Sequence, residues 1–184
     1  MIHIIGTRHP LQVWTPAKRN SKSLDASKGD VERFECYVAD AARALSADVI
    51  AEEASEEWID DHGLGASSVA QGVADKLGVQ HIFCDPDRAE RRALGLRVGE
   101  EMRNHAMEVW VRTGGEFQDV HSEELKKQTP IREAFWLGRL KDCGPYDKSI
   151  IFVCGADHVD SFKAALGAES IPARILCRDW TERA

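Results

Sequence analysis

Two histidines follow the same short pattern, in which an apolar run ends in glycine and histidine comes three residues later. Residues 2–5 lead into Gly6-Thr7-Arg8-His9, and residues 149–154 lead into Gly155-Ala156-Asp157-His158. A glycine that ends a strand lets the chain turn and lets a ligand approach the backbone closely. Ligands of open α/β sheets bind outside the carboxyl ends of the strands. We therefore expect His9 and His158 to share one site.

A histidine that faces such a crevice acts as a metal ligand or as a general base. A third segment, Gly78-Val79-Gln80-His81, fits the same spacing but precedes a strand. We therefore expect His81 to lie at the opposite edge of the sheet, away from the other two histidines.

Carboxylates follow two further apolar runs. Glu52 and Glu53 come after Val-Ile-Ala, and Asp85 comes after residues 79–84. A carboxylate at the end of a buried strand needs a cation or a hydrogen-bond donor. Glu52 is our first choice for the site because it directly follows the apolar residues, and Glu53 faces the opposite way if the strand continues. Asp85 has a second interpretation as a helix N-cap, with Pro86 at the first helical position.

Arginines accompany these carboxylates. Arg132 opens the segment 131–140 and has Trp136 four residues later, where the ring can stack on the guanidinium. We place Arg132 in the catalytic set with Glu52, Glu53 and Asp85. Four other arginines adjoin the motifs and are assigned to substrate binding: Arg8, Arg88, Arg91 and Arg92.

The apolar runs predict a parallel sheet, because they are short, continuous and rich in Ile and Val. They occupy residues 2–5, 48–51, 79–84, 149–154 and 171–177. Helical patterns lie between them, at 30–46, 67–77, 87–112, 122–141 and 157–166. This alternation predicts one three-layer α/β domain over residues 1–184, with a mostly parallel sheet of about five strands flanked by helices. The long connection at 10–27 and the helical insertion at 98–141 lie beside the motifs, and the insertion is a candidate lid.

Composition narrows the function classes. The chain is 43% hydrophobic and 30% charged, and its net charge of −7 argues against a general nucleic-acid binder. There is no apolar run near 18 residues and the first strand begins at residue 2, so we expect a cytoplasmic protein without a membrane span. Five cysteines without a C-x-x-C pair predict reduced thiols, and Cys154 beside Gly155 is a minor candidate nucleophile.

Taken in order, these residues resemble the TraB/Tiki group of the erythromycin-esterase (EreA)/ChaN-like superfamily. That group has two GxxH motifs near opposite ends and a glutamate that ends the second strand, which matches Glu52 in Val-Ile-Ala-Glu. Its Asp-Arg turn is similar to Asp85-Pro86-Asp87-Arg88, where Pro86 and Asp87 are extra, and its arginine helix is similar to residues 131–136. The resemblance implies an EreA/ChaN-like fold. It also implies one of several activities: metal-dependent proteolysis as in Tiki members, histidine-based hydrolysis as in erythromycin esterases, or haem-iron binding as in ChaN.

Three functional hypotheses follow. The first is a metal-assisted hydrolase of peptide or ester bonds, with His9 and His158 as ligands of Mn, Co, Fe or Zn. Glu52, or alternatively Glu53, is the third ligand or the base for a metal-bound water. The second is an esterase that uses a histidine as general base without a metal. The third is a non-enzymatic protein that binds an anion through the basic segment 8–28. The expected partner is a small-molecule or peptide substrate, and assembly into a homo-oligomer is left open.

Overall fold

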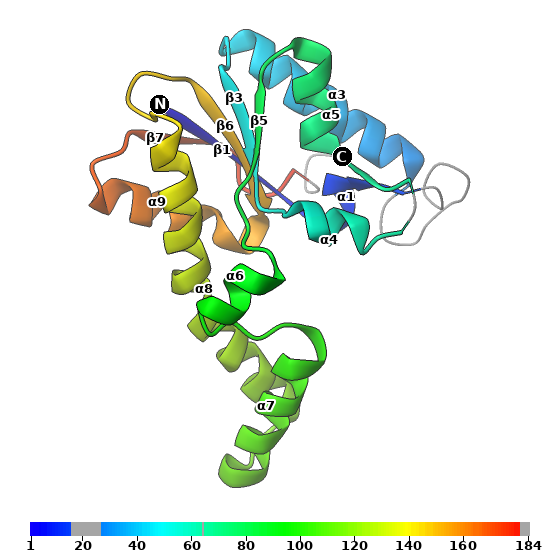
Figure 1. The fold of residues 1–184 in the computed structure, drawn as a ribbon, viewed down its shortest axis with the longest axis vertical. Coiled ribbons are helices and arrows are strands. Elements are labelled where there is room, and N and C mark those ends of the chain that lie inside the picture. The colour runs from blue at the N-terminus through cyan, green and yellow to red at the C-terminus, as the bar shows by residue number, and fades with distance from the viewer. Residues whose placement is uncertain (16–26, 64, 181–184) are drawn as a thin grey trace.

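The computed structural model describes residues 1–15, 27–63 and 65–180, and it has the expected α/β architecture (Figure 1). Five parallel strands form the main sheet in the order β5-β3-β6-β1-β7. They are β1 (Ile2–Thr7), β3 (Val49–Glu52), β5 (Gln80–Phe83), β6 (Ile150–Gly155) and β7 (Ala173–Cys177). The ends of all five strands lie within two residues of the ends of the predicted apolar runs. The runs located the strands because buried strands of a parallel sheet are apolar on both faces.

The strand order brings the two GxxH motifs together. β1 and β6 are neighbours at the centre of the sheet, and Thr7 pairs in register with Gly155. β3 lies on the other side of β6, where Glu52 pairs with Val153. The ends of the first, second and fourth predicted strands therefore meet at one edge, although they are far apart in sequence.

Helices cover both faces of the sheet, as Figure 1 shows. On one face, α3 (Lys28–Ala44) and α5 (Val69–Leu77) pack on strand side chains such as Ile5 and Ile50. On the other face, α9 (Val159–Ala168) and the C-terminal part of α8 (Phe117–Asp142) pack on side chains such as Phe152. The prediction of three layers is therefore confirmed.

Polar residues define where the covering helices begin. Ser27 caps α3 and forms a capping box with Asp30, in which each side chain accepts a hydrogen bond from the other residue's backbone N–H. Ser68 caps α5, which ends at Gly78 with a φ of 68°, a left-handed conformation that favours glycine. These residues set where α3 and α5 begin and where α5 ends.

The insertion at 98–141 forms a helical hairpin. α7 (Gly99–Thr113) packs against α8 and is separated from it by Gly114 and Gly115, as the double glycine predicted. Figure 1 shows α7 and the first part of α8 extending away from the sheet. Residues Val98 and Gly99 nevertheless line the cavities described below, so the hairpin borders the site at its base. Its action as a lid stays a prediction.

Several local features differ from the sequence analysis. The helical segment predicted at 87–112 is two helices, α6 (Arg88–Ala93) and α7, because Gly95 adopts a φ of 70° between them. Asp87, not Asp85, caps α6, and its capping box with Glu90 replaces the cap proposed for Asp85. The predictions missed the short elements around the site: α1 (His9–Gln12), β2 (Val13–Trp14), α4 (Glu56–Asp60), β4 (Ser67–Ser68) and the 3₁₀ turn η1 (Ala156–His158).

Three further expectations concern the connection at 10–27, membrane-spanning helices and the cysteines. The connection at 10–27 begins with α1 and β2, whereas Lys18, Arg19 and Lys22 of the predicted basic segment lie outside the described residues. Within the described parts of the chain, no helix has the length and apolar character needed to cross a membrane. Cys84, Cys154 and Cys177 are buried free thiols.

Candidate functional site

His9, His158 and Glu53 meet at the carboxyl edge of the sheet. The Nε2 atoms of His9 and His158 lie 3.9 Å and 3.5 Å from the same oxygen, Oε1 of Glu53. The other oxygen of Glu53 accepts a hydrogen bond of 2.7 Å from the backbone N–H of Gly155. The two motifs therefore supply one histidine each to a common carboxylate.

Gly155 provides the space in which these groups meet. A Cβ atom at this position would lie 3.3 Å from Glu53 Oε2, 3.4 Å from His9 Nε2 and 3.5 Å from a ring carbon of His158. Gly6 has a different reason to be glycine, because a Cβ there would lie 1.9 Å from the carbonyl oxygen of Arg178. Gly6 is required by packing, whereas Gly155 leaves room for the three side chains above β6.

Glu53 occupies the position that we assigned first to Glu52, and this preference is corrected. Side chains alternate along a strand, so the two carboxylates point to opposite faces of β3. Glu52 is fully buried and accepts hydrogen bonds from Ser68 Oγ and from His81 Nε2, the latter at 2.8 Å. His81 belongs to the cluster of Glu52 rather than to that of His9 and His158. Its ring reaches the last residue of β3, however, so the expectation that His81 lies at the opposite edge of the sheet is wrong.

Arg132 links Glu53 to Asp85. Its NH2 group donates to Glu53 Oε1 at 2.7 Å and to Asp85 Oδ1 at 2.9 Å, and its Nε also donates to Asp85 at 3.0 Å. Asp85 accepts further hydrogen bonds from Arg91 and from the indole N–H of Trp136. The guanidinium carbon of Arg132 lies 5.1 Å from the Trp136 ring centroid, which confirms the predicted stacking. Asp85 is therefore held as a partner of the arginines.

This network keeps Arg132 charged despite its burial. Burial has the largest single effect on the pKa of Arg132 and lowers it, but the attraction of Glu53 and Asp85 outweighs burial and raises the pKa overall. The positive charge of Arg132 in turn stabilises the negative charge of Glu53, whose side chain has no exposed surface. Glu53 is consequently held in a fixed position beside the two histidines.

Gln12 sets the tautomer of His9. The Nδ1 atom of His9 lies 3.2 Å from Gln12 Oε1, an oxygen that can only accept a hydrogen bond. With the amide in this orientation, Nδ1 carries the proton of the neutral ring and Nε2, the atom that faces Glu53, keeps its lone pair. The His9 side chain is half exposed, so this lone pair is open to a ligand.

His158 has a different environment. Its Nδ1 lies 3.1 Å from Glu133 Oε1, which also accepts a hydrogen bond of 2.6 Å from Ser161. Burial alone would lower the pKa of His158, but the hydrogen bond to Glu133 and the charge of Glu53 outweigh it and raise the pKa above its ordinary value. His158 therefore holds its second proton to higher pH than a solvated histidine does.

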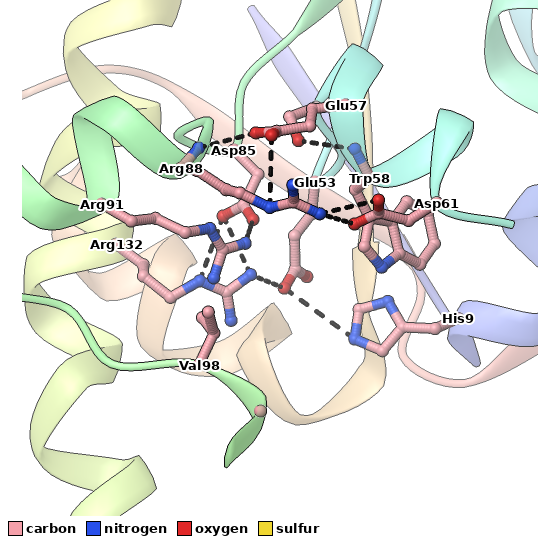
Figure 2. Close-up of a pocket in the computed structure, with 12 residues that line it drawn as sticks. His9, Glu53, Glu57, Trp58, Asp61, Asp85, Arg88, Arg91, Val98 and Arg132 are labelled. Atoms are coloured by element: carbon pink, nitrogen blue, oxygen red, sulfur yellow. Dashed lines mark hydrogen bonds and ion pairs between the residues drawn. The ribbon is translucent and has the colours of Figure 1, made fainter. Parts of the chain in front are cut away.

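Two cavities meet at this site. One, which we call the His9 cavity, has a volume of about 550 Å³ and is shown in Figure 2. The other, the His158 cavity, has a volume of about 800 Å³ and lies against α8. They share four lining residues: Arg91, Val98, Gly99 and Arg132. The two cavities are therefore adjacent, with these four residues at their common boundary.

The arginines assigned to substrate binding have separate places. Arg88 lines the His9 cavity but is paired with Glu57 and Asp61. Arg91 lines both cavities and is paired with Asp85. Arg8 and Arg92 line neither of them; Arg8 is the exposed N-cap residue of α1, and Arg92 is exposed in α6. The structure therefore brings two of the four to the site.

Trp58 is a site residue that the sequence analysis missed. Its ring lines the His9 cavity and makes an edge contact with His9 at a centroid distance of 5.9 Å (Figure 2). It makes a second edge contact with His62, at 4.5 Å. Trp58 belongs to α4, which has only five residues and follows Ser55, its N-cap. The Ser-x-x-Trp spacing beside Glu53 was the available signal, but so short a helix has no periodicity that predicts it.

Cys154 does not reach the site. It is fully buried in β6, and burial together with the charges of Glu53 and Glu133 raises the pKa of its thiol well above the ordinary value. A protonated and enclosed thiol is a poor nucleophile, so the minor cysteine hypothesis has no geometric support.

The donor types for a metal are present, but their arrangement does not fit one. Glu53 already binds Arg132 through Oε1 and Gly155 through Oε2, and a divalent ion at Oε1 would have to displace the cationic Arg132. No group of three or more His, Cys, Asp or Glu side chains in the described parts of the chain is arranged to hold a metal ion. Ligation by His9, His158 and a glutamate stays a prediction.

Comparison of the chain with protein-family models, with curated proteins and with solved structures found no match. The resemblance to TraB/Tiki proteins therefore remains a prediction that rests on the motifs alone.

Proposed function

We propose that this protein is a hydrolase of ester or peptide bonds in which His9 acts as the general base for a water molecule. The observation that carries the proposal is the position of His9 Nε2, which faces Glu53 Oε1 across 3.9 Å at the wall of the His9 cavity. This separation is too long for a direct hydrogen bond, and a water that contacts both atoms would lie to one side of the line between them, in the cavity. Such a water would contact both the histidine nitrogen and the carboxylate of Glu53.

The proposed reaction divides the work between the two histidines. His9 Nε2 takes a proton from the water while the water oxygen forms a bond to the substrate carbonyl carbon. The tetrahedral intermediate then collapses, and the bond to the leaving group breaks. His158, whose pKa is raised, gives a proton from Nε2 to the departing atom, and exchange with solvent then removes the proton from His9 and restores the one on His158. His9, the base, and His158, the acid, thus have different surroundings, and it is these surroundings that suit each ring to its role.

Glu53, Arg132 and Gly155 have positioning roles in this proposal. The backbone N–H of Gly155 and the guanidinium of Arg132 each fix one oxygen of Glu53, so the carboxylate cannot rotate away from the histidines. Asp85 and Trp136 fix Arg132 in turn. Such rigid support reduces the reorganisation that is needed during reaction.

Metal-assisted hydrolysis is the second candidate. The convergence of the two histidine Nε2 atoms on one carboxylate oxygen favours it, because histidine and carboxylate are ligands of Zn, Mn, Co and Fe. It requires Arg132 to leave Glu53, whereas the metal-free reaction uses the site as it stands.

The test is an assay of 4-nitrophenyl acetate and of fluorogenic peptide amides, with and without a chelator. Purified wild-type protein is expected to hydrolyse a member of this panel, and His9→Ala is expected to lose about 100-fold or more of kcat, the usual contribution of a general base. His9 is half exposed, so the variant should keep the melting temperature of the wild type.

His121→Ala is the matched control, because His121 lies in α8 outside both cavities. Activity that survives the chelator and needs His9 supports the metal-free mechanism, and activity lost to the chelator supports the metal-assisted one. A wild-type protein that cleaves nothing in the panel, or a fully active His9→Ala variant, contradicts the proposed function.

A further inference from the structure

The two cavities differ in the balance of their charges. In the His9 cavity each arginine has carboxylates beside it. Arg88 lies 2.7 Å from Asp61 and 3.2 Å from Glu57, and Arg132 and Arg91 bind the carboxylates of Glu53 and Asp85. Cations that are neutralised in this way have little capacity left for a charged ligand.

The His158 cavity contains cations without such neutralisation. The backbone N–H of Arg97 donates to Gln128, but no carboxylate within the described parts of the chain forms an ion pair with its guanidinium. Lys126 pairs with Glu123 at 2.7 Å, and both side chains are about two-thirds exposed. An exposed pair of this kind is weak and is readily exchanged for another partner.

The acidic residues that line the His158 cavity, Glu133 and Asp157, form no ion pair with Arg97 or Lys126 in the described parts of the chain. Glu133 is buried and is already engaged by His158 and Ser161. Asp157 is exposed in η1, beside His158. Arg97 and Lys126 remain as cations with donor groups open to a ligand, next to a histidine of the site.

We propose that the His158 cavity binds an anionic group of the ligand, a carboxylate or a phosphate, through Arg97 and Lys126. Guanidinium groups bind both anions through paired hydrogen bonds, and a lysine ammonium adds a flexible point charge. Because Arg132 and Val98 line both cavities, a ligand anchored there extends past His158 toward His9. The inference rests on the proposed function only in taking this ligand to be the substrate.

The experiment measures binding rather than turnover, so that it does not depend on hydrolysis. Benzoate, phenyl phosphate and neutral benzamide are titrated calorimetrically into the wild-type protein. Benzoate or phenyl phosphate is expected to bind while benzamide does not, and higher salt should weaken the binding. The relative affinities of the two anions distinguish a carboxylate site from a phosphate site.

Arg97→Gln and Lys126→Gln test the assignment. Arg97→Gln is expected to raise the Kd of the preferred anion about tenfold, which is the effect of losing one charged contact. Arg103→Gln is the control, because Arg103 is exposed on α7 outside the cavity. All these positions are exposed, so the variants should fold normally.

Equal binding of benzamide and the anions, equal effects of Arg97→Gln and Arg103→Gln, or no anion binding at all would overturn the inference. The binding experiment and the hydrolysis assay can fail independently of each other. Anion binding without turnover would support the inference and contradict the proposed function, and turnover without anion binding would do the reverse.

Discussion

Glu52 and Glu53 are consecutive residues whose carboxylates belong to two separate polar clusters. Glu52 binds Ser68 and His81, whereas Glu53 binds Arg132 and faces the two histidines of the GxxH motifs. The alternation of side chains along β3 separates them. A change of one residue in the register of this strand would exchange the two carboxylates.

Replacement of each glutamate by glutamine should therefore have unequal effects. Glu53→Gln is expected to lower kcat about 100-fold or more, because a neutral amide neither holds Arg132 nor orients the water. Glu52→Gln should stay within a few-fold of wild-type kcat, because the Glu52 side chain lies outside both cavities. Steady-state kinetics of both variants, with melting temperatures as a check on folding, makes the comparison. Equal losses of kcat would show that the distinction between the carboxylates is wrong.

The two motif glycines should respond differently to alanine. At Gly155 the added Cβ meets Glu53 and His9 at 3.3–3.4 Å, so Gly155→Ala is expected to fold and to lose activity as the side chains shift. At Gly6 the added Cβ meets the Arg178 carbonyl at 1.9 Å and a Val159 methyl group at 2.5 Å. Overpacking of this severity costs about 1–3 kcal/mol or more, and Gly6→Ala should fail to fold or melt much earlier. Thermal unfolding and activity of each variant test this contrast, and a stable, inactive Gly6→Ala would contradict it.

The contribution of His158 to stability should depend on pH. Its folded-state pKa is raised above the ordinary value of 6.5, so the protonated ring is favoured by folding. The resulting stabilisation is fully present below pH 6.5 and is lost as the pH rises through the raised pKa. Urea unfolding of the wild type and His158→Gln should therefore differ more at about pH 6 than at about pH 9. Glu133→Gln should reduce this pH dependence, and a constant difference across the range would contradict the assigned pKa direction.

Arg132 should be required for stability as well as for activity. Arg132→Met leaves Glu53 and Asp85 buried without their shared cation, which is expected to cost about 3–5 kcal/mol. Arg132→Lys keeps the charge but cannot form the same paired contacts, so its loss in unfolding free energy should be smaller. Urea denaturation of both variants measures the two losses. A lysine variant that is no more stable than the methionine variant would mean that geometry, and not charge, explains the requirement.

Several features of the molecule were accessible from the amino-acid sequence. Apolar runs of four to seven residues predicted the five strands, because a parallel sheet buries both faces of each strand. The GxxH motifs predicted that His9 and His158 lie at one edge, since parallel strands end on the same side. The partnership of Arg132 with Trp136 followed from their helical spacing.

Other features depended on contacts between segments that are far apart in the chain. The sequence did not reveal that β1 and β6 are neighbours, which of the two glutamates faces the histidines, or that Arg132 bridges Glu53 and Asp85. The sequence also did not reveal that Asp87, through its capping box with Glu90, caps α6 in place of Asp85. Local periodicity determined the type of each long element and the edge at which the motifs end. Tertiary packing decided strand order, side-chain register and charge pairing, because these depend on which distant groups must share the same buried space.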